Sequence, residues 1–238
     1  MKTLILTASA LAFSAGFAMA DTIRMGTEGA YPPYNFIDDK GEVAGFEREV
    51  GDELCKRAEL TCEWVTNEWD SIIPNLLSGN YDTIIAGMSI TDERMETIDF
   101  TQNYFPPAAS AYMALSAEAD LMGVVAAQTG TIQADYVAKS GATLLEFATL
   151  DDTVAAVKNG EADAVFADKD ALAPFVTDGG EFVWSGDDVP LGGGIGVGLR
   201  KSDTELKDKL NAAITSMKED GSINALITKY FGEEAKTF

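Results

Sequence analysis

The chain has 238 residues and a formal net charge of −22, with 39 acidic and 17 basic side chains. This charge argues against nucleic acid and anionic membrane surfaces as partners, because Lys and Arg supply the affinity for phosphate groups. The sequence contains no histidine, which excludes Ser-His-Asp and Cys-His catalysis and most zinc chemistry. We therefore expect no metal site and no cofactor.

The N-terminal stretch has the pattern of a secretory signal peptide. A short basic start, Met1-Lys2, precedes an apolar run that ends in the small-residue pattern Ala18-Met19-Ala20. This pattern predicts a signal peptide at residues 1–20, cleaved after Ala20. No later stretch reaches the roughly 18 apolar residues needed to span a bilayer. In an exported protein, Cys55 and Cys62 are expected to form a disulfide.

The remainder of the chain predicts alternating strands and helices. The first series has strands at 22–26, 63–66 and 84–86 and helices at 46–57 and 70–78. The second series has strands at 123–126, 143–147 and 164–167 and helices at 131–140 and 151–159. A strand at 195–200 and helices at 203–219 and 222–230 complete the pattern. A βαβαβ order is typical of a mostly parallel sheet.

The two series match at a constant offset of 81 residues, as from Asp70 to Asp151. At this offset Gly79, Asp82 and Ala86 align with Gly160, Asp163 and Ala167. Either a true repeat or the shared grammar of βα units explains the match, and both imply two similar lobes. Such lobes bind ligands beyond the carboxyl ends of their strands. Gly87 and Asp168 hold the same strand-end place and are predicted to face each other across a cleft.

We therefore expect an α/β fold of two Rossmann-like lobes joined by a two-strand hinge. Lobe 1 would comprise residues 21–109 plus 195–238, and lobe 2 residues 110–194. The chain would cross between the lobes near 108–114 and near 194–198. Two strand-like crossings of this kind make a hinge.

Five motifs are spread over the mature chain. They are Thr27-Glu-Gly-Ala-Tyr-Pro-Pro-Tyr-Asn-Phe36, Gly45-Phe46-Glu47, Trp69-Asp70-x-x-x-Pro74, Met88-Ser-Ile-Thr-x-x-Arg94 and Gly196-Val-Gly-Leu-Arg200. In order and spacing they resemble the polar-amino-acid class of periplasmic solute-binding proteins of ABC importers, and most nearly its lysine/arginine/ornithine-, histidine- and opine-binding group. The resemblance implies a type II-like periplasmic binding protein fold, a small amino acid as ligand, an inner-membrane ABC permease as partner and a monomer. The segment from Cys55 to Cys62 also resembles that group's disulfide.

The chemistry of an amino-acid ligand gives these positions roles that the resemblance supports. A zwitterion that leaves water needs both charges satisfied, since desolvation costs several kcal/mol per ion. Arg94 offers a planar fork for the α-carboxylate beside Ser89. The helix that begins at Thr131 presents backbone N–H groups that can share this carboxylate. Asp168 would take the α-ammonium from the second lobe, so that binding bridges the lobes.

The remaining positions concern the ligand's side chain. Tyr31 and Trp69 are predicted walls that grip an aliphatic stem and stack on a cation, although both could instead be core aromatics. Glu28 follows the first strand, where relatives with cationic ligands carry an acid; it could also be a solvated loop residue. Ala86-Gly87 departs from the two serines frequent in those relatives, which leaves opines and glutamine-like ligands open.

A different class of function uses the same fold. A periplasmic cyclohexadienyl dehydratase shares it, and Glu28 or Asp168 could serve such an enzyme as the carboxylic acid that protonates a leaving group. The fold also serves as a sensor domain in receptors. The sequence favours a binding protein over both alternatives.

Overall fold

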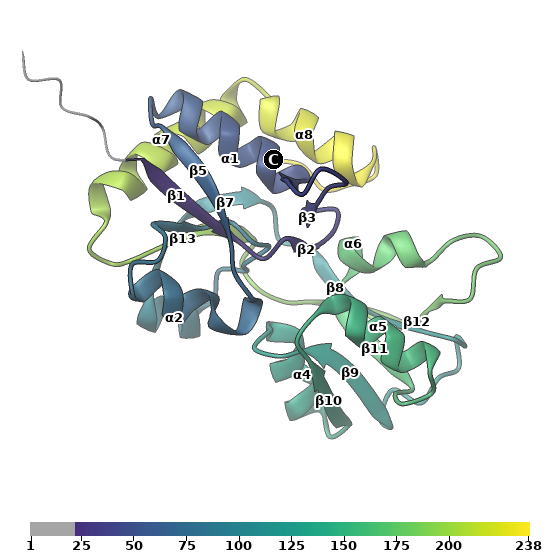
Figure 1. Ribbon diagram of the computed structural model, residues 1–238. Helices are drawn as coiled ribbons and strands as arrows, with labels where there is room; N and C mark the ends of the chain where they lie inside the picture. Colours follow the sequence, from purple (N-terminus) through teal and green to yellow (C-terminus); the bar gives the residue numbers. More distant parts are fainter. Residues whose placement is uncertain (1–21) are drawn as a thin grey trace, which may run out of the picture.

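Residues 22–238 are described by the structure, a computed structural model. The predicted signal peptide lies outside this range. Two five-stranded sheets form the framework, one above the other in Figure 1. Within the described range, no helix combines the length and the apolar character that crossing a membrane requires. The α/β architecture expected from the sequence is confirmed.

The first sheet has the strand order β5-β1-β6-β13-β7. Strands β5 and β6 pair with β1 in parallel, whereas β13 runs antiparallel to β6 and β7. Helices α1, α7 and α8 lie together over one face of this sheet, and α2 lies on the other side (Figure 1). The strands are β1 (Ile23–Thr27), β5 (Cys62–Thr66), β6 (Thr83–Ile84), β7 (Asp99–Phe105) and β13 (Ile195–Leu199). The helices are α1 (Phe46–Arg57), a short helical turn (Trp69–Ser71), α2 (Ile72–Leu77), α3 (Asp92–Thr97), α7 (Thr204–Glu219) and α8 (Ser222–Phe231).

The second sheet has the order β10-β9-β11-β8-β12. Strands β10 and β11 pair with β9 in parallel, and β8 runs antiparallel to β11 and β12. Helices α4 and α5 pack on β9. The strands are β8 (Ala109–Ala114), β9 (Val124–Gln128), β10 (Thr143–Phe147), β11 (Ala164–Asp168) and β12 (Val183–Pro190). The helices are α4 (Ile132–Ser140), α5 (Leu150–Lys158), α6 (Lys169–Leu172) and a second short turn (Ala173–Phe175).

A third, small sheet was not expected from the sequence. It has the order β2-β3-β4 and consists of β2 (Ala30–Tyr31), β3 (Asn35–Ile37) and β4 (Val43–Ala44). The fully buried Tyr34 anchors it, because its ring packs against Phe46 of α1, Phe105 of β7 and Phe231 of α8 with centroid distances of 6.4, 5.4 and 4.8 Å. The neighbouring Tyr31 is thereby held at the edge of the first half of the molecule.

The 81-residue offset seen in the sequence recurs in the structure. Strands β6 and β11 begin at equivalent positions, and helices α2 and α5 end at equivalent positions. Asp82 accepts a hydrogen bond from the backbone N–H of Arg24 at 3.0 Å, and its counterpart Asp163 accepts one from the N–H of Val124 at 2.8 Å. Each aspartate thus fixes the start of its strand, β6 or β11, against the neighbouring parallel strand, β1 or β9. The two sheets are built from the same βα unit.

The turns that follow these helices show why the matched glycines occur. Gly79 and Gly160 have φ angles of +79° and +76°. A residue with a Cβ adopts this left-handed conformation only at a cost, which glycine avoids. The predicted helix ends at 78 and 159 are therefore confirmed to within one residue, although the helix expected over 70–78 is divided into the turn at Trp69–Ser71 and α2.

The connections between the two large sheets differ in detail from the prediction. The chain leaves β7 at Phe105 and enters β8 at Ala109, and it leaves β12 at Pro190 and enters β13 at Ile195. The crossings therefore lie in residues 106–108 and 191–194, so they overlap the expected stretches, 108–114 and 194–198, only at residues 108 and 194. The assignment of residues 21–109 plus 195–238 and 110–194 to two lobes stays a prediction.

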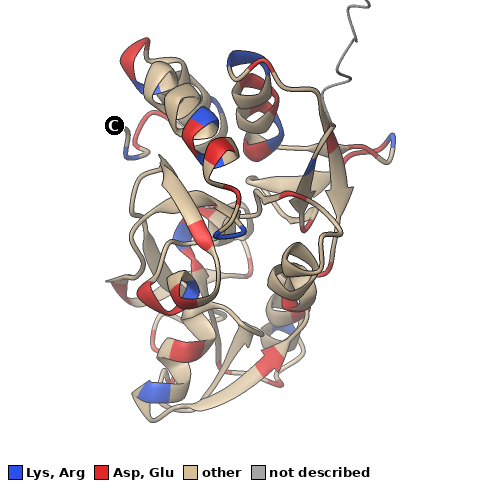
Figure 2. Ribbon diagram, turned by 90° about the vertical axis from the view of Figure 1, so that its left-hand side faces the viewer, with Lys and Arg blue, Asp and Glu red and all other residues tan. Residues whose placement is uncertain are grey.

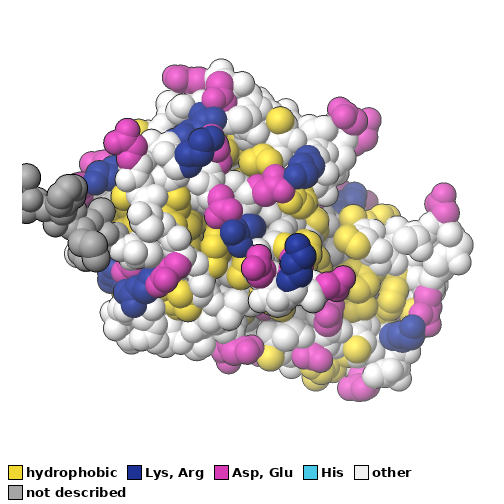
Figure 3. Space-filling model, turned by 45° about the horizontal axis from the view of Figure 1, so that its top comes forward, with side chains coloured by type: hydrophobic (Ala, Val, Ile, Leu, Met, Phe, Trp, Pro, Cys, Tyr) yellow, Lys and Arg dark blue, Asp and Glu magenta, His cyan; other side chains and the backbone are white. Residues whose placement is uncertain are grey.

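Two further expectations concern the covalent structure and the surface. Cys55 and Cys62 form the expected disulfide, which joins the end of α1 to the start of β5. Acidic residues occur on helices and loops of both halves (Figure 2), and the face in Figure 3 carries dispersed acidic side chains with basic ones among them. Dispersed charge of this kind favours solubility and does not by itself form a site.

Candidate functional site

A cavity of about 300 Å³ lies between the two large sheets. It is formed where the carboxyl ends of the parallel strands meet, since Glu28 follows β1, Gln128 ends β9 and Asp168 ends β11. This is the position at which doubly wound folds bind ligands. The eight ligand-binding residues predicted from the sequence all line it, together with four that were not predicted. The lining residues are Glu28, Tyr31, Trp69, Ala86, Gly87, Ser89, Arg94, Gln128, Thr131, Ile132, Gln133 and Asp168.

Arg94 enters the cavity from α3, which begins after Thr91. The Thr91 side chain caps this helix by accepting a hydrogen bond from the N–H of Arg94 at 3.1 Å. The guanidinium donates a hydrogen bond to the carbonyl of Ser89 at 2.9 Å. It also donates to the carbonyl of Gly130, which belongs to the other half of the molecule, at 3.3 Å. It lies 5.5 Å from the centroid of the Trp69 ring. Burial lowers the pKa of Arg94 from its ordinary value, but an arginine remains charged in proteins.

Thr131 caps the N-terminus of α4, as the sequence predicts. Its Oγ1 accepts from the N–H of Ala134 at 3.1 Å and donates to the carbonyl of Gln128 at 2.7 Å. The first turn of this nine-residue helix lines the cavity through Thr131, Ile132 and Gln133. The positive end of the helix dipole therefore faces the same space as the Arg94 guanidinium.

Asp168 is bound from both halves of the molecule. Its Oδ2 accepts from the Tyr31 hydroxyl at 2.8 Å, and its Oδ1 accepts from Nε2 of Gln133 at 2.9 Å. Burial raises the pKa of Asp168 to about 6, against the opposing effects of these hydrogen bonds and of nearby Arg94. A buried carboxylate in such surroundings gains from a cationic partner.

Glu28 is the third charged group of the cavity and lies in a different part of it. Its Oε1 accepts a hydrogen bond of 2.6 Å from Nε2 of Gln128, which comes from the second sheet. Burial raises the pKa of Glu28 to about 7. Glu28 also borders an outer groove beside Glu68, whereas Asp168 and Ser89 border a small cavity at the crossings. The cavity thus has Arg94 and Asp168 on one side and Glu28 on another.

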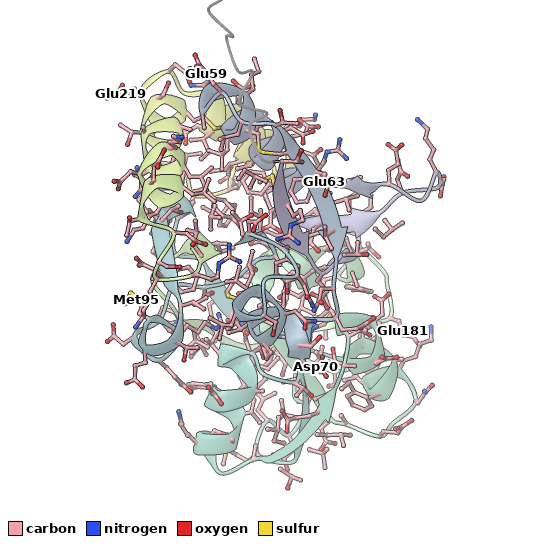
Figure 4. The ribbon with its side chains drawn as sticks, turned by 60° about the vertical axis from the view of Figure 1, so that its left-hand side comes forward. Glu59, Glu63, Asp70, Met95, Glu181 and Glu219 are labelled. Atoms are coloured by element: carbon pink, nitrogen blue, oxygen red, sulfur yellow. A yellow bond between two sulfur atoms is a disulfide. The ribbon has the colours of Figure 1, made fainter. Side chains whose placement is uncertain are left out.

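The alternative interpretations of the aromatic residues can now be compared with their positions. Tyr31 and Trp69 are 7% and 8% exposed, so both are packed like core residues, yet both also line the cavity. Trp69 begins the short turn that follows β5. Figure 4 shows the next residue of this turn, Asp70, near the boundary between the two halves, far from Glu59 and Glu219. The burial of Tyr31 and Trp69 makes their rings fixed walls for any molecule in the cavity.

Glu47 lies behind the cavity wall and holds the backbone of Gly87, a role that was not predicted. Its fully buried carboxylate accepts from the N–H of Gly87 and from Nδ2 of Asn35, both at 2.6 Å, and from the hydroxyl of Tyr104. Burial raises the pKa of Glu47. These bonds hold the Gly87 backbone at the cavity wall. Glu47 belongs to the Gly45-Phe46-Glu47 motif, and an acid inside an otherwise apolar helix face is the signal that could have identified it.

Gln128 and Gln133 were also missed. Both are buried, and both use side-chain amides to reach acidic groups of the cavity, namely Glu28 and Asp168. Their positions at the end of a strand and in the first turn of a helix are the only sequence signals. Polar residues at such positions are common, so sequence alone did not distinguish these two.

The comparisons with known proteins agree with this geometry. Residues 23–233 match the family model described as bacterial extracellular solute-binding proteins, family 3. The L-arginine-binding protein of Pseudomonas aeruginosa is 33% identical over 232 residues, covering 90% of both chains. The lysine/arginine/ornithine-binding periplasmic protein of Escherichia coli is 32% identical over 255 residues, covering 97% of both.

A solved structure is more similar still. A periplasmic His/Glu/Gln/Arg/opine family-binding protein from Silicibacter pomeroyi, crystallised in complex with lysine, is 73% identical. The match covers 91% of this chain and 100% of that chain with a TM-score of 0.90. These relatives are named as binding proteins and not as enzymes.

Proposed function

Because the chain belongs to family 3 of the bacterial extracellular solute-binding proteins, we propose that it is the periplasmic component of an ABC importer that binds a cationic amino acid of the arginine, lysine, ornithine or histidine type. The single observation that carries this proposal is the set of charges that line one cavity: the guanidinium of Arg94 and the carboxyl groups of Asp168 and Glu28. A free cationic amino acid carries the complementary set.

The two charged α-groups of the ligand account for Arg94 and Asp168. The α-carboxylate would bind the Arg94 guanidinium and the N–H groups at the start of α4. The α-ammonium would bind Asp168, whose carboxylate is already oriented by Tyr31 and Gln133. The same cavity is lined by both of these groups, so one small zwitterion could contact them together.

Glu28 determines the class of side chain in this proposal. A buried carboxylate attracts a guanidinium or ammonium group and repels a second acid. Tyr31 and Trp69 would enclose the aliphatic stem between the two ends. The names of the arginine- and lysine/arginine/ornithine-binding relatives, and the lysine complex of the 73% identical protein, support this choice.

The hydrogen bonds across the cavity suggest how binding leads to transport. Tyr31 to Asp168, Gln128 to Glu28 and Arg94 to Gly130 each join one half to the other. We propose that the ligand binds first to the half containing Arg94, that Asp168 then engages, and that the halves close around residues 106–108 and 191–194. The closed form would dock on an inner-membrane permease after the protein, freed of residues 1–20, has reached the periplasm.

Isothermal titration calorimetry tests the proposal directly. The protein lacking residues 1–20 would be titrated with arginine, lysine, ornithine, histidine, glutamine and octopine at pH 7.5. We expect the cationic amino acids to bind more tightly than glutamine. An absence of binding by every one of them would refute the amino-acid assignment, and product formation from prephenate or arogenate would indicate the dehydratase alternative.

An opine is the second candidate ligand, and a specific feature favours it. A small cavity adjoins Asp168 and Ser89 and is bordered by Tyr34, Pro106 and Ala108 at the crossings. An opine extends the α-nitrogen, the group assigned to Asp168, so its extra acid would point toward this space. Octopine binding tighter than arginine in the same titration would favour this candidate.

A further inference from the structure

Gln128 has an unusual position for an uncharged residue. It ends β9, is only 5% exposed, and donates from Nε2 to the carbonyl of Ala148 at 3.0 Å and to Oε1 of Glu28 at 2.6 Å. An amide nitrogen carries two N–H groups, so both are used. The bond to Ala148 lies within the second half of the molecule and fixes the amide. The other N–H therefore points across the cavity at Glu28.

The backbone of Gln128 is held as well. Its carbonyl accepts the hydroxyl of Thr131, which in turn caps α4. The residue is thus fixed at both its main chain and its side chain before it meets Glu28. A hydrogen bond made by a fixed donor costs little additional side-chain entropy.

The surroundings of Glu28 explain what this bond does. From the first half, Glu28 is faced by Glu68 after β5, by Glu47 of α1 and by Tyr31 of β2. Burial and the two acids raise the pKa of Glu28, and the Gln128 bond acts in the opposite direction by favouring the charged form. Without it, closure would favour a protonated, neutral Glu28.

We propose that Gln128 is a positioning residue for side-chain selectivity: it keeps Glu28 charged and aimed into the cavity when the two halves meet, so that a cationic side chain is preferred over its neutral isostere. This inference rests on the proposed function. An amide is suited to this task because it stabilises a carboxylate without neutralising it. A Lys or Arg in its place would compete with the ligand's cation for Glu28.

The test compares arginine with citrulline, which has the same α-groups and nearly the same shape but a neutral side chain. Calorimetry of the wild type gives the ratio of the two affinities. In the variant Gln128→Leu we expect this ratio to fall by about tenfold, the effect of losing a hydrogen bond to a charged group. Circular dichroism checks the fold, and Gln128→Met replaces the first variant if its spectrum is not native.

A double-mutant cycle identifies the route of the effect. If Gln128 acts through Glu28, the double variant Gln128→Leu/Glu28→Gln has the same ratio of arginine to citrulline affinity as Glu28→Gln alone. The matched control is Gln133→Leu, the same change on the Asp168 side of the cavity. It is expected to weaken arginine and citrulline equally, so the ratio stays that of the wild type.

The pH profile gives a readout that a merely structural role would not move. Arginine remains a cation throughout, so its affinity for the wild type should fall as the pH is lowered through about 7, where Glu28 titrates. In Gln128→Leu the midpoint of this fall should lie at higher pH. An unchanged ratio, or an unchanged midpoint, would overturn the proposal. A wild type that binds neither arginine nor lysine would instead refute the proposed function itself.

Discussion

Replacement of Glu28 by Gln is expected to make the ligand-free protein more stable at pH 8 while weakening its binding of cationic amino acids. The reason is the burial of a carboxylate among Glu47 and Glu68 with only a neutral amide, Gln128, to stabilise it. A glutamine at position 28 has the same shape, and its carbonyl can accept the same hydrogen bond. The variant therefore removes the buried charge and little else.

The magnitude follows from the titration of Glu28. Its pKa is raised from 4.5 to about 7 in the folded protein, so the charged form is destabilised by folding. At pH 8 the group is ionised in both states, and the free energy of unfolding is lowered by about 3 kcal/mol. As the pH falls below 7 the folded protein takes up a proton, and at pH 5 the cost is about 1 kcal/mol.

Urea denaturation at pH 8 and pH 5, without ligand, measures this difference. We expect the free energy of unfolding of Glu28→Gln to exceed that of the wild type by up to about 3 kcal/mol at pH 8 and by clearly less at pH 5. The exposed neighbour Glu68 supplies the control, because Glu68→Gln removes the same charge and should change stability by less than about 0.5 kcal/mol. Equal stability of Glu28→Gln and the wild type at pH 8 would refute the reasoning, since Glu28 would then be hydrated in the ligand-free protein.

Three further variants test the remaining parts of the site and the scaffold. Arg94→Lys keeps the charge but not the planar fork, and calorimetry should show about tenfold weaker binding or worse; wild-type affinity would contradict the carboxylate role. Asp168→Asn should weaken binding at least as much, and it should remove the additional loss of affinity below about pH 6, where Asp168 takes up a proton, while the loss caused by Glu28 near pH 7 remains. Replacing Cys55 and Cys62 by Ser opens a short loop and should lower the free energy of unfolding by about 2 kcal/mol in urea. Arginine affinity should be unchanged in that double variant, since the disulfide joins α1 to the end of β5 remote from the cavity.

The elements with a clear hydrophobic period could be predicted from the sequence. Helix α1 and strand β10 have the predicted bounds, because apolar residues in α1 recur at helical spacing and Gly or Asn residues separate the elements. The small sheet could not be predicted. Its strands have two or three residues, and they are stabilised by the packing of Tyr34 on three distant aromatic rings, which a local pattern does not show.

Strand β12 was missed for a related reason. Its sequence, Val183-Trp-Ser-Gly-Asp-Asp-Val-Pro190, is polar in the middle, and its pairing with β8 shifts register between Ser185 and Val189. Such a strand forms because β8 supplies its hydrogen bonds, so its own sequence carries little signal that would predict it. Strand β7 is similar, with Thr, Gln and Asn between its aromatic residues.

The site divides in the same way. Gly87 and Asp168 followed from the strand-end argument, which needs only the order of the elements. Arg94, Tyr31 and Glu28 needed the family resemblance, because single Arg, Tyr and Glu residues in loops carry no signal of their own. Gln128 has a role only when the second half meets Glu28, and the distance in sequence between these two residues is 100.

The two matched βα units form a similar scaffold in both halves, but the cavity between them is asymmetric. The positions that build the unit are shared: Asp82 and Asp163 bind a backbone N–H in the same way, and Gly79 and Gly160 end their helices in the same conformation. At the carboxyl ends of the two matched units, the sequence diverges. The first half presents the backbone of Gly87, held by the buried Glu47, whereas the second half presents the carboxylate of Asp168. A zwitterion has one positive and one negative end. Two identical lobes would present the same kind of group to both ends and so could bind only one of the two charges. The place where the two matched units differ is therefore the place where a ligand with opposite charges can be oriented.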